Sequence, residues 1–150
     1  MRLPHLFAAN TAIKRRVNDL LLKQLLSKDG VCKIAILNMK PGPEWHMLRW
    51  TAYEEFLKER NGEAPMMKDY DLKYVGAVET LLPGWTVEQI ESHLFCFLEG
   101  VYCMFQDGRV EGYKGHSLSM SDVIGFSDGK GNARWFYVDR VDFEELEWEA

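Results

Sequence analysis

The stretch from Val31 to Met39 places the strongest constraint on how this chain folds. It contains four apolar residues in succession, Ile34 to Leu37, and turn-forming residues bound it at Asp29-Gly30 and at Pro41-Gly42-Pro43. A short, continuous apolar run between turn signals is typical of a buried strand. Because 150 residues can enclose one such core, we expect a single folded unit around this strand.

The first thirty residues are expected to form a separate element, an amphipathic basic helix that precedes an α+β domain over residues 31–150. The helix is predicted to run from Asn10 or Thr11 to about Lys28, where a glycine-containing turn ends it. Its apolar positions recur at helical spacing, at Ile13, Val17, Leu20, Leu21 and Leu25. This pattern favours a face packed on the protein's own sheet. The flanking Leu22 and Leu26 leave open a helix that docks on a partner or on a second copy.

Helix and strand signals alternate in the middle of the chain. Two capping boxes, Thr51 to Glu54 and Thr86 to Gln89, each predict the start of a helix, because their side chains can satisfy each other's free backbone amides. The first of these helices is expected to end at Asn61-Gly62. Residues 70–78 alternate as in a strand, one face of which carries Tyr70, Leu72 and Tyr74.

The last third of the chain is predicted to be mostly strand. Phe95 to Phe105 fits a helix end, a turn and a short strand, and Asp107-Gly108 predicts a hairpin that pairs this strand with Val110–Tyr113. A second hairpin is predicted to pair Ser117–Phe126 with Arg134–Val138. The order of elements indicates an α+β fold with an antiparallel, partly barrel-like sheet and two or three packed helices.

The most distinctive motif runs from Gly115 to Ile124 with the sequence GHSLSMSDVI. Its serines alternate with larger side chains, so an extended chain would turn one set toward the core and the other outward. Asp122 precedes the apolar pair of the motif and can fold its carboxylate onto nearby backbone N–H groups, which tightens a turn. We therefore interpret the polar residues of this stretch as a structural motif, composed of His116, Ser117, Ser119, Ser121 and Asp122.

This motif resembles that of the YodL-like domain family. The resemblance continues at Tyr137-Val138-Asp139 and at Asp142 to Leu146, and it covers roughly Cys32 to Leu146. Three other segments follow the family's order, namely Lys33–Leu37, Leu48–Trp50 and Thr86–Ile90. The chain departs from the family at Asp142, where members usually carry Gly, and in its additional residues 94–113.

The resemblance implies a setting and a fold, and it carries over no catalytic residue. Such domains look like parts of proteins carried by conjugative elements and phages of gut and soil Firmicutes, often beside antirestriction modules. No catalytic activity is established for the family. The hairpin pattern is also similar to that of small PUA-like barrels, an analogy at the level of fold.

The motif contains the residue types of a hydrolase triad, but its spacing argues against one. On one extended strand His116 and Ser117 point to opposite faces, and no strained Gly-x-Ser-x-Gly turn is present. We expect hydrogen-bonded serines instead, with His116 tethered to a backbone carbonyl. The histidines and cysteines lack metal-ligand spacing, and the turn at Gly129–Gly131 does not open a helix as a phosphate cradle would. No catalytic residue, metal or cofactor is therefore expected.

The net charge of −5 is unevenly distributed. Six basic and two acidic residues give the first thirty residues +4, which leaves −9 on the rest of the chain. An acidic body disfavours a grip on a phosphate backbone and favours a basic protein surface. The acidic candidates for partner binding are Asp139, Asp142, Glu144, Glu145 and Glu147.

Two further partner-binding candidates, Trp45 and Arg49, follow the Pro-Gly-Pro turn. Trp and Arg are enriched at the energetic centres of interfaces. Leu48 and Trp50, in the same segment, are expected in the core.

These features predict a non-enzymatic interaction protein of a mobile genetic element. In its sharpest form the prediction is an inhibitor of a host restriction or CRISPR nuclease, whose basic groove the acidic surface would occupy. Two alternatives stay open. One is a small barrel-type nucleic-acid-binding module that uses Lys14 to Arg16, and the other is a serine hydrolase built on Ser117 or Ser121 with His116.

The sequence also predicts a compartment. No apolar run approaches the roughly 18–20 residues of a membrane span, and the first ten residues do not resemble a signal peptide. Three cysteines without a pairing pattern predict buried thiols in a reducing cytoplasm. The oligomeric state is left open.

Overall fold

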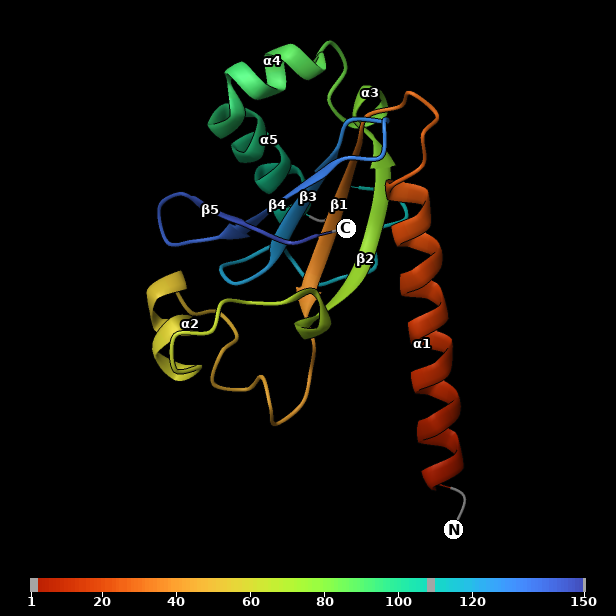
Figure 1. Cartoon of the computed structure of the whole chain (residues 1–150), viewed down its shortest axis with the longest axis vertical. Helices are drawn as coiled ribbons and strands as arrows, with labels where there is room; N and C mark the ends of the chain where they lie inside the picture. The colour runs from red at the N-terminus through yellow and green to blue at the C-terminus, as the bar shows by residue number, and fades with distance from the viewer. Residues whose placement is uncertain (1–2, 108–109, 150) are drawn as a thin grey trace.

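A computed structural model describes residues 3–107 and 110–149 of the chain, with side chains from Ala12 onward. The helices are α1 (Leu3–Leu25), α2 (Tyr53–Glu59), the 3-10 helix η1 (Met67–Asp69), α3 (Val78–Leu81), α4 (Val87–Ser92) and α5 (Leu94–Gln106). The strands are β1 (Lys33–Met39), β2 (Tyr70–Ala77), β3 (Val123–Ser127), β4 (Ala133–Val138) and β5 (Phe143–Leu146). The strands form one antiparallel sheet in the order β2-β1-β3-β4-β5 (Figure 1).

The predicted α+β fold with an antiparallel sheet is confirmed. The sheet is curled but open, because β2 and β5 are its two edges and do not pair with each other. The described residues form five α-helices, whereas two or three were expected. No helix among these residues has the length and apolar character that a membrane crossing requires.

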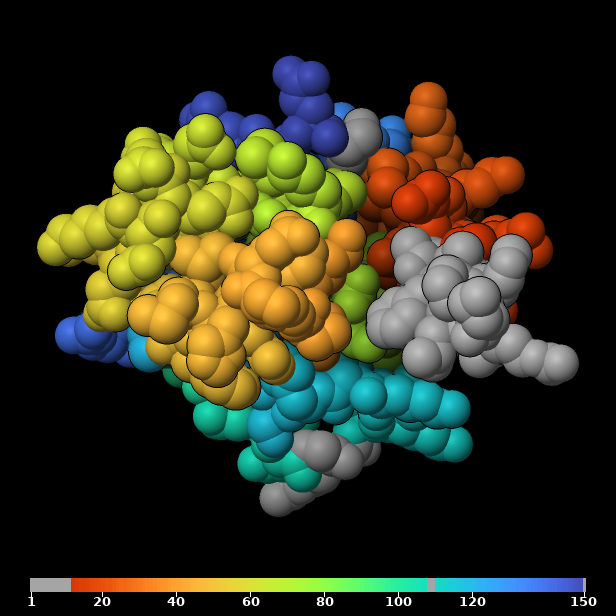
Figure 2. All heavy atoms as spheres, turned by 90° about the horizontal axis from the view of Figure 1, so that it is seen from below, coloured from red at the N-terminus to blue at the C-terminus, as the bar shows by residue number. Residues whose placement is uncertain are grey.

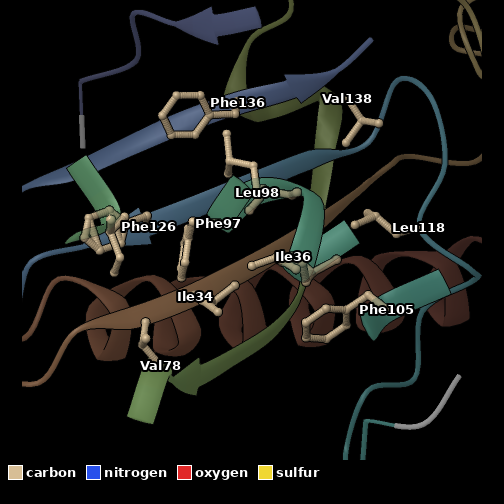
Figure 3. Close-up of a cluster of buried hydrophobic side chains, with 13 residues drawn as sticks. Ile34, Ile36, Val78, Phe97, Leu98, Phe105, Leu118, Phe126, Phe136 and Val138 are labelled. Carbon is tan, nitrogen blue, oxygen red and sulfur yellow. The ribbon is translucent and has the colours of Figure 1, made fainter. Parts of the chain in front are cut away.

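Strand β1 is the centre of the fold, and all seven of its residues are buried. Ile34 and Ile36 face a core layer beneath α4 and α5, where Phe97 and Phe105 pack against them (Figure 3). The intervening Ala35, Leu37 and Met39 face a second core on the other side of the sheet. Both faces of this strand therefore need apolar residues, which explains its continuous apolar run.

The second core is closed by α1, α2 and the loop between β1 and α2. Leu25 of α1, Leu48 of the loop and Phe56 of α2 are buried there against the sheet. The indole of Trp135 and the ring of Tyr137 fill the centre of this layer from β4. Helices α4 and α5 thus cover one face of the antiparallel sheet, and α1, α2 and the β1–α2 loop cover the other (Figure 1).

The expected face of β2 is interrupted by a bulge. The register shifts between Ile36 and Leu37, so that Ile36 lies opposite Tyr74 and Leu37 opposite Leu72. Lys73 is the additional residue, and it turns the strand by one position. Tyr70 and Leu72 accordingly face the second core, whereas Tyr74 packs against the first. The prediction that all three share one face is wrong for Tyr74.

Helix α1 is longer than predicted and packs differently. It begins at Leu3, because Pro4 lies in the first turn, where a helix needs no intrahelical N–H donor, and it ends at Leu25. Three residues of the expected buried stripe are exposed, namely Ile13 at 59%, Val17 at 47% and Leu20 at 61%. The helix runs along the edge strand β2 and continues past the end of the sheet, so only its last turns reach the core (Figure 1).

Helix α1 also protects the edge of the sheet. The Asn18 side chain oxygen accepts a hydrogen bond of 3.0 Å from the backbone N–H of Leu72 in β2. An unpaired sheet edge otherwise offers free backbone groups to other chains. The β2 edge is therefore covered by this helix.

Residues 95–105 form one continuous helix, so the predicted turn and strand are wrong. Phe97, Leu98, Val101 and Phe105 lie at helical spacing and are all buried, which outweighs the alternation that suggested a strand. Gly100 lies on the less crowded side of α5 and does not interrupt it. The predicted hairpin is therefore absent, since Val110–Tyr113 is not a strand and part of the expected turn, Gly108, lies outside the described residues.

The cysteines of α5 lie opposite its core-facing side. Cys96 and Cys103 are exposed and Cys32 is partly buried, and all three are free thiols. The expectation of three buried thiols is wrong, because the helical conformation of α5 turns two of them outward.

Local capping signals differ in outcome. Thr86 caps α4 and forms the predicted box with Gln89. Thr51 does not cap α2, because its hydroxyl donates instead to the Leu48 carbonyl at 2.6 Å. The amide of Tyr53 instead donates to the Asp139 carboxylate at 3.0 Å, and Asp139 follows β4, 86 positions further along the chain. The second predicted hairpin is confirmed as β3 and β4, but its first strand begins at Val123 and not at Ser117.

Candidate functional site

The polar motif is organised around the carboxylate of Asp122. This side chain is buried and accepts a hydrogen bond of 2.9 Å from the backbone N–H of Ser119, which closes the predicted turn. The Nδ1 atom of His116 lies 3.6 Å from its Oδ2 atom. Burial raises the pKa of Asp122 to about 6, while the nearby imidazole and hydrogen bonds from Ser119, Met39 and Asn38 act in the opposite direction. Asp122 is thus a buried acid held by several donors.

The serines of the motif are engaged in structural hydrogen bonds. The Ser117 hydroxyl donates to the Gln106 carbonyl at 3.1 Å, and the Ser121 hydroxyl accepts from the backbone N–H of Trp50 at 2.9 Å. His116 Nδ1 lies 2.9 Å from the Ser117 carbonyl oxygen, the tether that the sequence predicts. Among the described residues, no hydrogen bond joins a serine hydroxyl to this imidazole. The arrangement ties α5 and the β1–α2 loop to the start of β3.

Two residues with strained backbones meet at this motif. Trp50 has φ of 62° and Ser121 has φ of 82°, and the Trp50 amide donates to the Ser121 hydroxyl. A positive φ in a bulky residue such as Trp is an outlier that surrounding contacts must hold in place. Figure 2 shows this side of the molecule from below, with residues 41–52 at its centre and the segment near residue 120 beside them.

The loop before α2 exposes two large side chains, Trp50 and Met47, that were not among the predicted partner-binding residues. Trp50, which was expected in the core, is 58% exposed, and Met47 is 66% exposed. The guanidinium of Arg49 lies over the Trp50 ring at 4.6 Å from its centroid. Leu48 is buried as expected. The left-handed conformation of Trp50 turns its side chain outward, and the sequence carries no local signal for that conformation.

Trp45 is half-buried and takes part in the fold. Its indole N–H donates to the Asp69 carboxylate at 3.1 Å, and Lys40 lies 5.8 Å from the ring centroid. Asp69 is buried and also binds Arg60 through both of its oxygens. The exposed aromatic of this loop is therefore Trp50, and Trp45 anchors the loop to η1.

The acidic candidates lie between β4 and β5, on β5 and directly after it. Asp139 caps α2 and accepts from the Arg140 amide, so both interactions serve the fold. Glu145 forms two short hydrogen bonds with Arg134, and this guanidinium holds the pKa of Glu145 below its ordinary value. Asp142 accepts from the Phe143 amide at 2.7 Å. The exposed side chains of Glu144 and Glu147 complete the set.

A groove of about 700 Å³ runs beside these glutamates. It lies between β5 with the residues that follow it and the loop after α2, and its lining residues are Tyr53, Glu63, Ala64, Pro65, Met66, Glu145, Leu146, Glu147 and Trp148. The Trp148 indole N–H donates to the Pro65 carbonyl at 2.8 Å and joins the two sides. This groove combines carboxylates with two aromatic rings. Of its lining, only Glu145 and Glu147 were selected from the sequence.

The groove was not predictable because distant segments form it. Tyr53, the loop at Glu63 to Met66 and the segment at Glu145 to Trp148 are far apart in the sequence. Trp148 packs on Trp135 at 5.3 Å between ring centroids, which fixes the final segment against the second core.

Basic residues gather on the opposite edge of the sheet. Lys14 and Arg15 of α1 line a cavity of about 220 Å³ together with Lys40, Asn18, Pro41 and Asp71. The carboxylate of Asp71 offsets part of this positive charge. In the part of the chain that the structure describes, no cluster of three His, Cys, Asp or Glu side chains could hold a metal ion.

The comparisons with known proteins agree with the sequence resemblance. No curated protein and no solved structure matches this chain. The YodL-like domain family matches residues 33–148, which include β1, the polar motif around Asp122 and the β5 groove, and exclude α1. Because the match spans well over half of the chain, the protein belongs to the YodL-like domain family.

Proposed function

We propose that this protein is a non-enzymatic interaction protein that binds a basic surface of another protein through the β5 groove. The observation that carries the proposal is the lining of that groove, which combines the carboxylates of Glu63 and Glu147 with two aromatic rings. Carboxylates attract a basic partner over a distance, and aromatic rings supply apolar contact area after docking. Protein interfaces combine the same two features, an aromatic centre and a charged rim.

The charge of the groove is only partly neutralised within the protein. Glu145 is paired with Arg134, and Arg140 is paired with Glu55 of α2. Glu63 and Glu147 line the groove, and Glu144 lies beside it on β5. All three are exposed, and none of them forms an ion pair within the described residues. These three carboxylates are therefore the side chains with which a cationic partner would pair. Exposed pairs of this kind steer association more than they add affinity.

The polar motif supports a role without covalent chemistry. Ser117 and Ser121 use their hydroxyls to connect segments of the fold, and Asp122 is buried beneath them. A catalytic triad instead needs a hydroxyl within hydrogen-bond reach of an imidazole that a carboxylate orients. A fluorophosphonate probe is therefore expected to label no serine, and labelling of Ser117 or Ser121 would favour the hydrolase alternative.

The partner that we propose is a host defence nuclease, such as a restriction or CRISPR effector, encountered in the cytoplasm. The family resemblance supports this choice, because such domains look like parts of mobile-element proteins that often lie beside antirestriction modules. A nuclease groove built for nucleic acid is basic, so an acidic protein surface can occupy it in place of the phosphate backbone. Inhibition would then require no change to the nuclease itself.

Charge reversal in the groove and directly beside it, at Glu147 and Glu144, tests this proposal. We expect Glu144→Lys with Glu147→Lys to weaken partner binding or nuclease inhibition at low salt by at least about tenfold, since two attractive charges become repulsive. Glu79→Lys with Glu88→Lys changes the net charge equally at exposed positions away from the groove, and it should change binding less than about threefold. The measurement is inhibition of a panel of purified nucleases, together with capture of basic partners at low and high salt.

Two results would contradict the proposal. One is a wild-type protein that inhibits no nuclease and captures no basic protein at low salt. The other is an equal effect of both double variants, which would indicate net charge and not the groove. A gel shift with single-stranded or duplex nucleic acid that depends on Lys14 and Arg15 would instead favour the nucleic-acid-binding alternative.

A further inference from the structure

We infer that the outer edge of β5 is an open docking edge, to which an extended, basic peptide segment of the partner adds as a sixth strand. The inference rests on the proposed function and names how the partner is held. It stands on the topology of the sheet, on the pattern of backbone hydrogen bonds in the β4–β5 hairpin, and on the groove beside that edge. Strand addition of this type gives affinity through the backbone and specificity through alternate side chains.

The two edges of the sheet differ in their protection. The β2 edge is covered by α1, and Asn18 satisfies the Leu72 amide there. Strand β5 is the last strand on the other side, and within the described residues it pairs only with β4 (Figure 1). Among the described elements, β4 makes the main contacts with β5, and no helix runs along its outer edge in Figure 1. An edge that is left open carries unpaired backbone groups.

The hairpin register shows which backbone groups point outward. The Asp139 amide donates to the Asp142 carbonyl at 2.9 Å, which makes these two residues a hydrogen-bonded pair. Hydrogen-bonded and non-hydrogen-bonded pairs alternate along an antiparallel ladder, so Glu144 and Leu146 bond inward to β4. Glu145 and, by continuation, Glu147 then direct their N–H and C=O groups away from β4. These two residues are also in the lining of the groove.

The charges and rings around this edge define the occupant. A peptide strand beside β5 would place alternate side chains on the two faces of the sheet. Basic side chains on one face would meet Glu147, which lies on the same face as Glu145, and apolar side chains on the other face would meet Trp148 and Tyr53. An extended segment that alternates Lys or Arg with apolar residues satisfies all of these contacts. The occupant is therefore a basic β-strand and not a basic helix.

A synthetic ten-residue peptide of alternating Lys and Val is the probe, and its binding is measured by fluorescence anisotropy. Replacing Glu147 by Pro removes an outward amide donor, and it should weaken binding by about tenfold. Glu147→Gln keeps the amide and removes the charge, so it should weaken binding less than about threefold and reduce the salt dependence. Equal unfolding temperatures of both variants and the wild type confirm that the fold is retained.

N-methylation of the peptide separates backbone pairing from charge attraction. Alternate peptide amides face β5, so methylation of one alternate set should abolish binding and methylation of the other set should preserve it. Binding that survives both methylations and Glu147→Pro would overturn strand addition, as would no binding of the unmodified peptide. The proposed function fails by a different result, the absence of any inhibited or captured partner. Partner binding that depends on Glu144 but tolerates Glu147→Pro would retain the function and reject the docking mode.

Discussion

Replacement of Asp122 by Ala is expected to destabilise the protein by about 3–5 kcal/mol, because it leaves buried donors without an acceptor. The carboxylate receives the Ser119 amide at 2.9 Å, and hydrogen bonds from Met39 and Asn38 also reach it. It is buried, so water cannot replace it in the native structure. Urea denaturation of the wild type and the variant at neutral pH measures the difference in the free energy of unfolding.

Asp142→Ala is the matched control for this substitution. Asp142 is exposed and accepts a hydrogen bond from the amide of its neighbour Phe143, where water can take its place. We expect this variant to lose less than about 1 kcal/mol. Equal losses in the free energy of unfolding at the two positions would contradict a structural role for the buried acid. They would show that the polar motif around Asp122 does not contribute specifically to stability.

The same residue makes stability depend on pH in a defined direction. Burial raises the pKa of Asp122 from the ordinary 3.8 to about 6, so the folded state binds this proton more tightly than the unfolded state does. Stability therefore rises as the pH falls from 8 toward 5, and the loss caused by Asp122→Ala should be about 1 kcal/mol larger at pH 5 than at pH 8. A smaller loss at pH 5 would indicate that the His116 imidazole holds the acid in its charged form.

Elements with strong local signals were predicted correctly from the sequence. The apolar run at Ile34 to Leu37 marks β1, and the turn after Ser127 joins β3 to β4. Thr86 and Gln89 form their capping box because both partners lie within one helical turn. The turn and the capping box join residues that are close in sequence, and the apolar run of β1 is itself a local signal of burial on both faces, which is why pattern and spacing were sufficient.

The incorrect predictions share a non-local cause. Packing against the sheet makes residues 94–106 one helix despite Gly100, and the bulge at Lys73 moves Tyr74 to the other face of β2. Asp139 replaces Thr51 as the cap of α2 from a distant part of the chain. Strand β5 was not predicted because its charged residues suit an edge strand as well as a solvated tail. The groove beside it therefore had no signature in the sequence.

The β5 groove is held in place by Trp135, whose indole fits into a narrow space above Gly125 in the second core. Trp135 of β4 lies opposite Gly125 of β3, and Ala35 of β1 lies opposite the other side of the same glycine. These two small residues leave room for the Trp135 indole across the sheet. A Cβ atom built on Gly125 would be 2.8 Å from Trp135 ring carbon Cζ3 and 3.2 Å from the Ala35 Cβ. Trp148 packs on this indole and donates a hydrogen bond to the Pro65 carbonyl. The position of Trp135 therefore affects both walls of the groove, the segment after β5 and the loop after α2.

Gly125→Ala is therefore expected to destabilise the protein by about 2–4 kcal/mol, because neither the indole nor the β1 backbone can move away without loss of packing. Gly100→Ala provides a control of opposite sign. A Cβ atom there meets only Leu82 side-chain atoms at 3.9 and 4.0 Å, and alanine favours the helix by about 0.5–1 kcal/mol. Thermal and urea unfolding measure both changes, and Trp fluorescence reports the displacement of Trp135 and Trp148 in the first variant. If Gly125→Ala unfolded at the wild-type urea concentration, the space for the indole would not be restricted, and the groove would not depend on it.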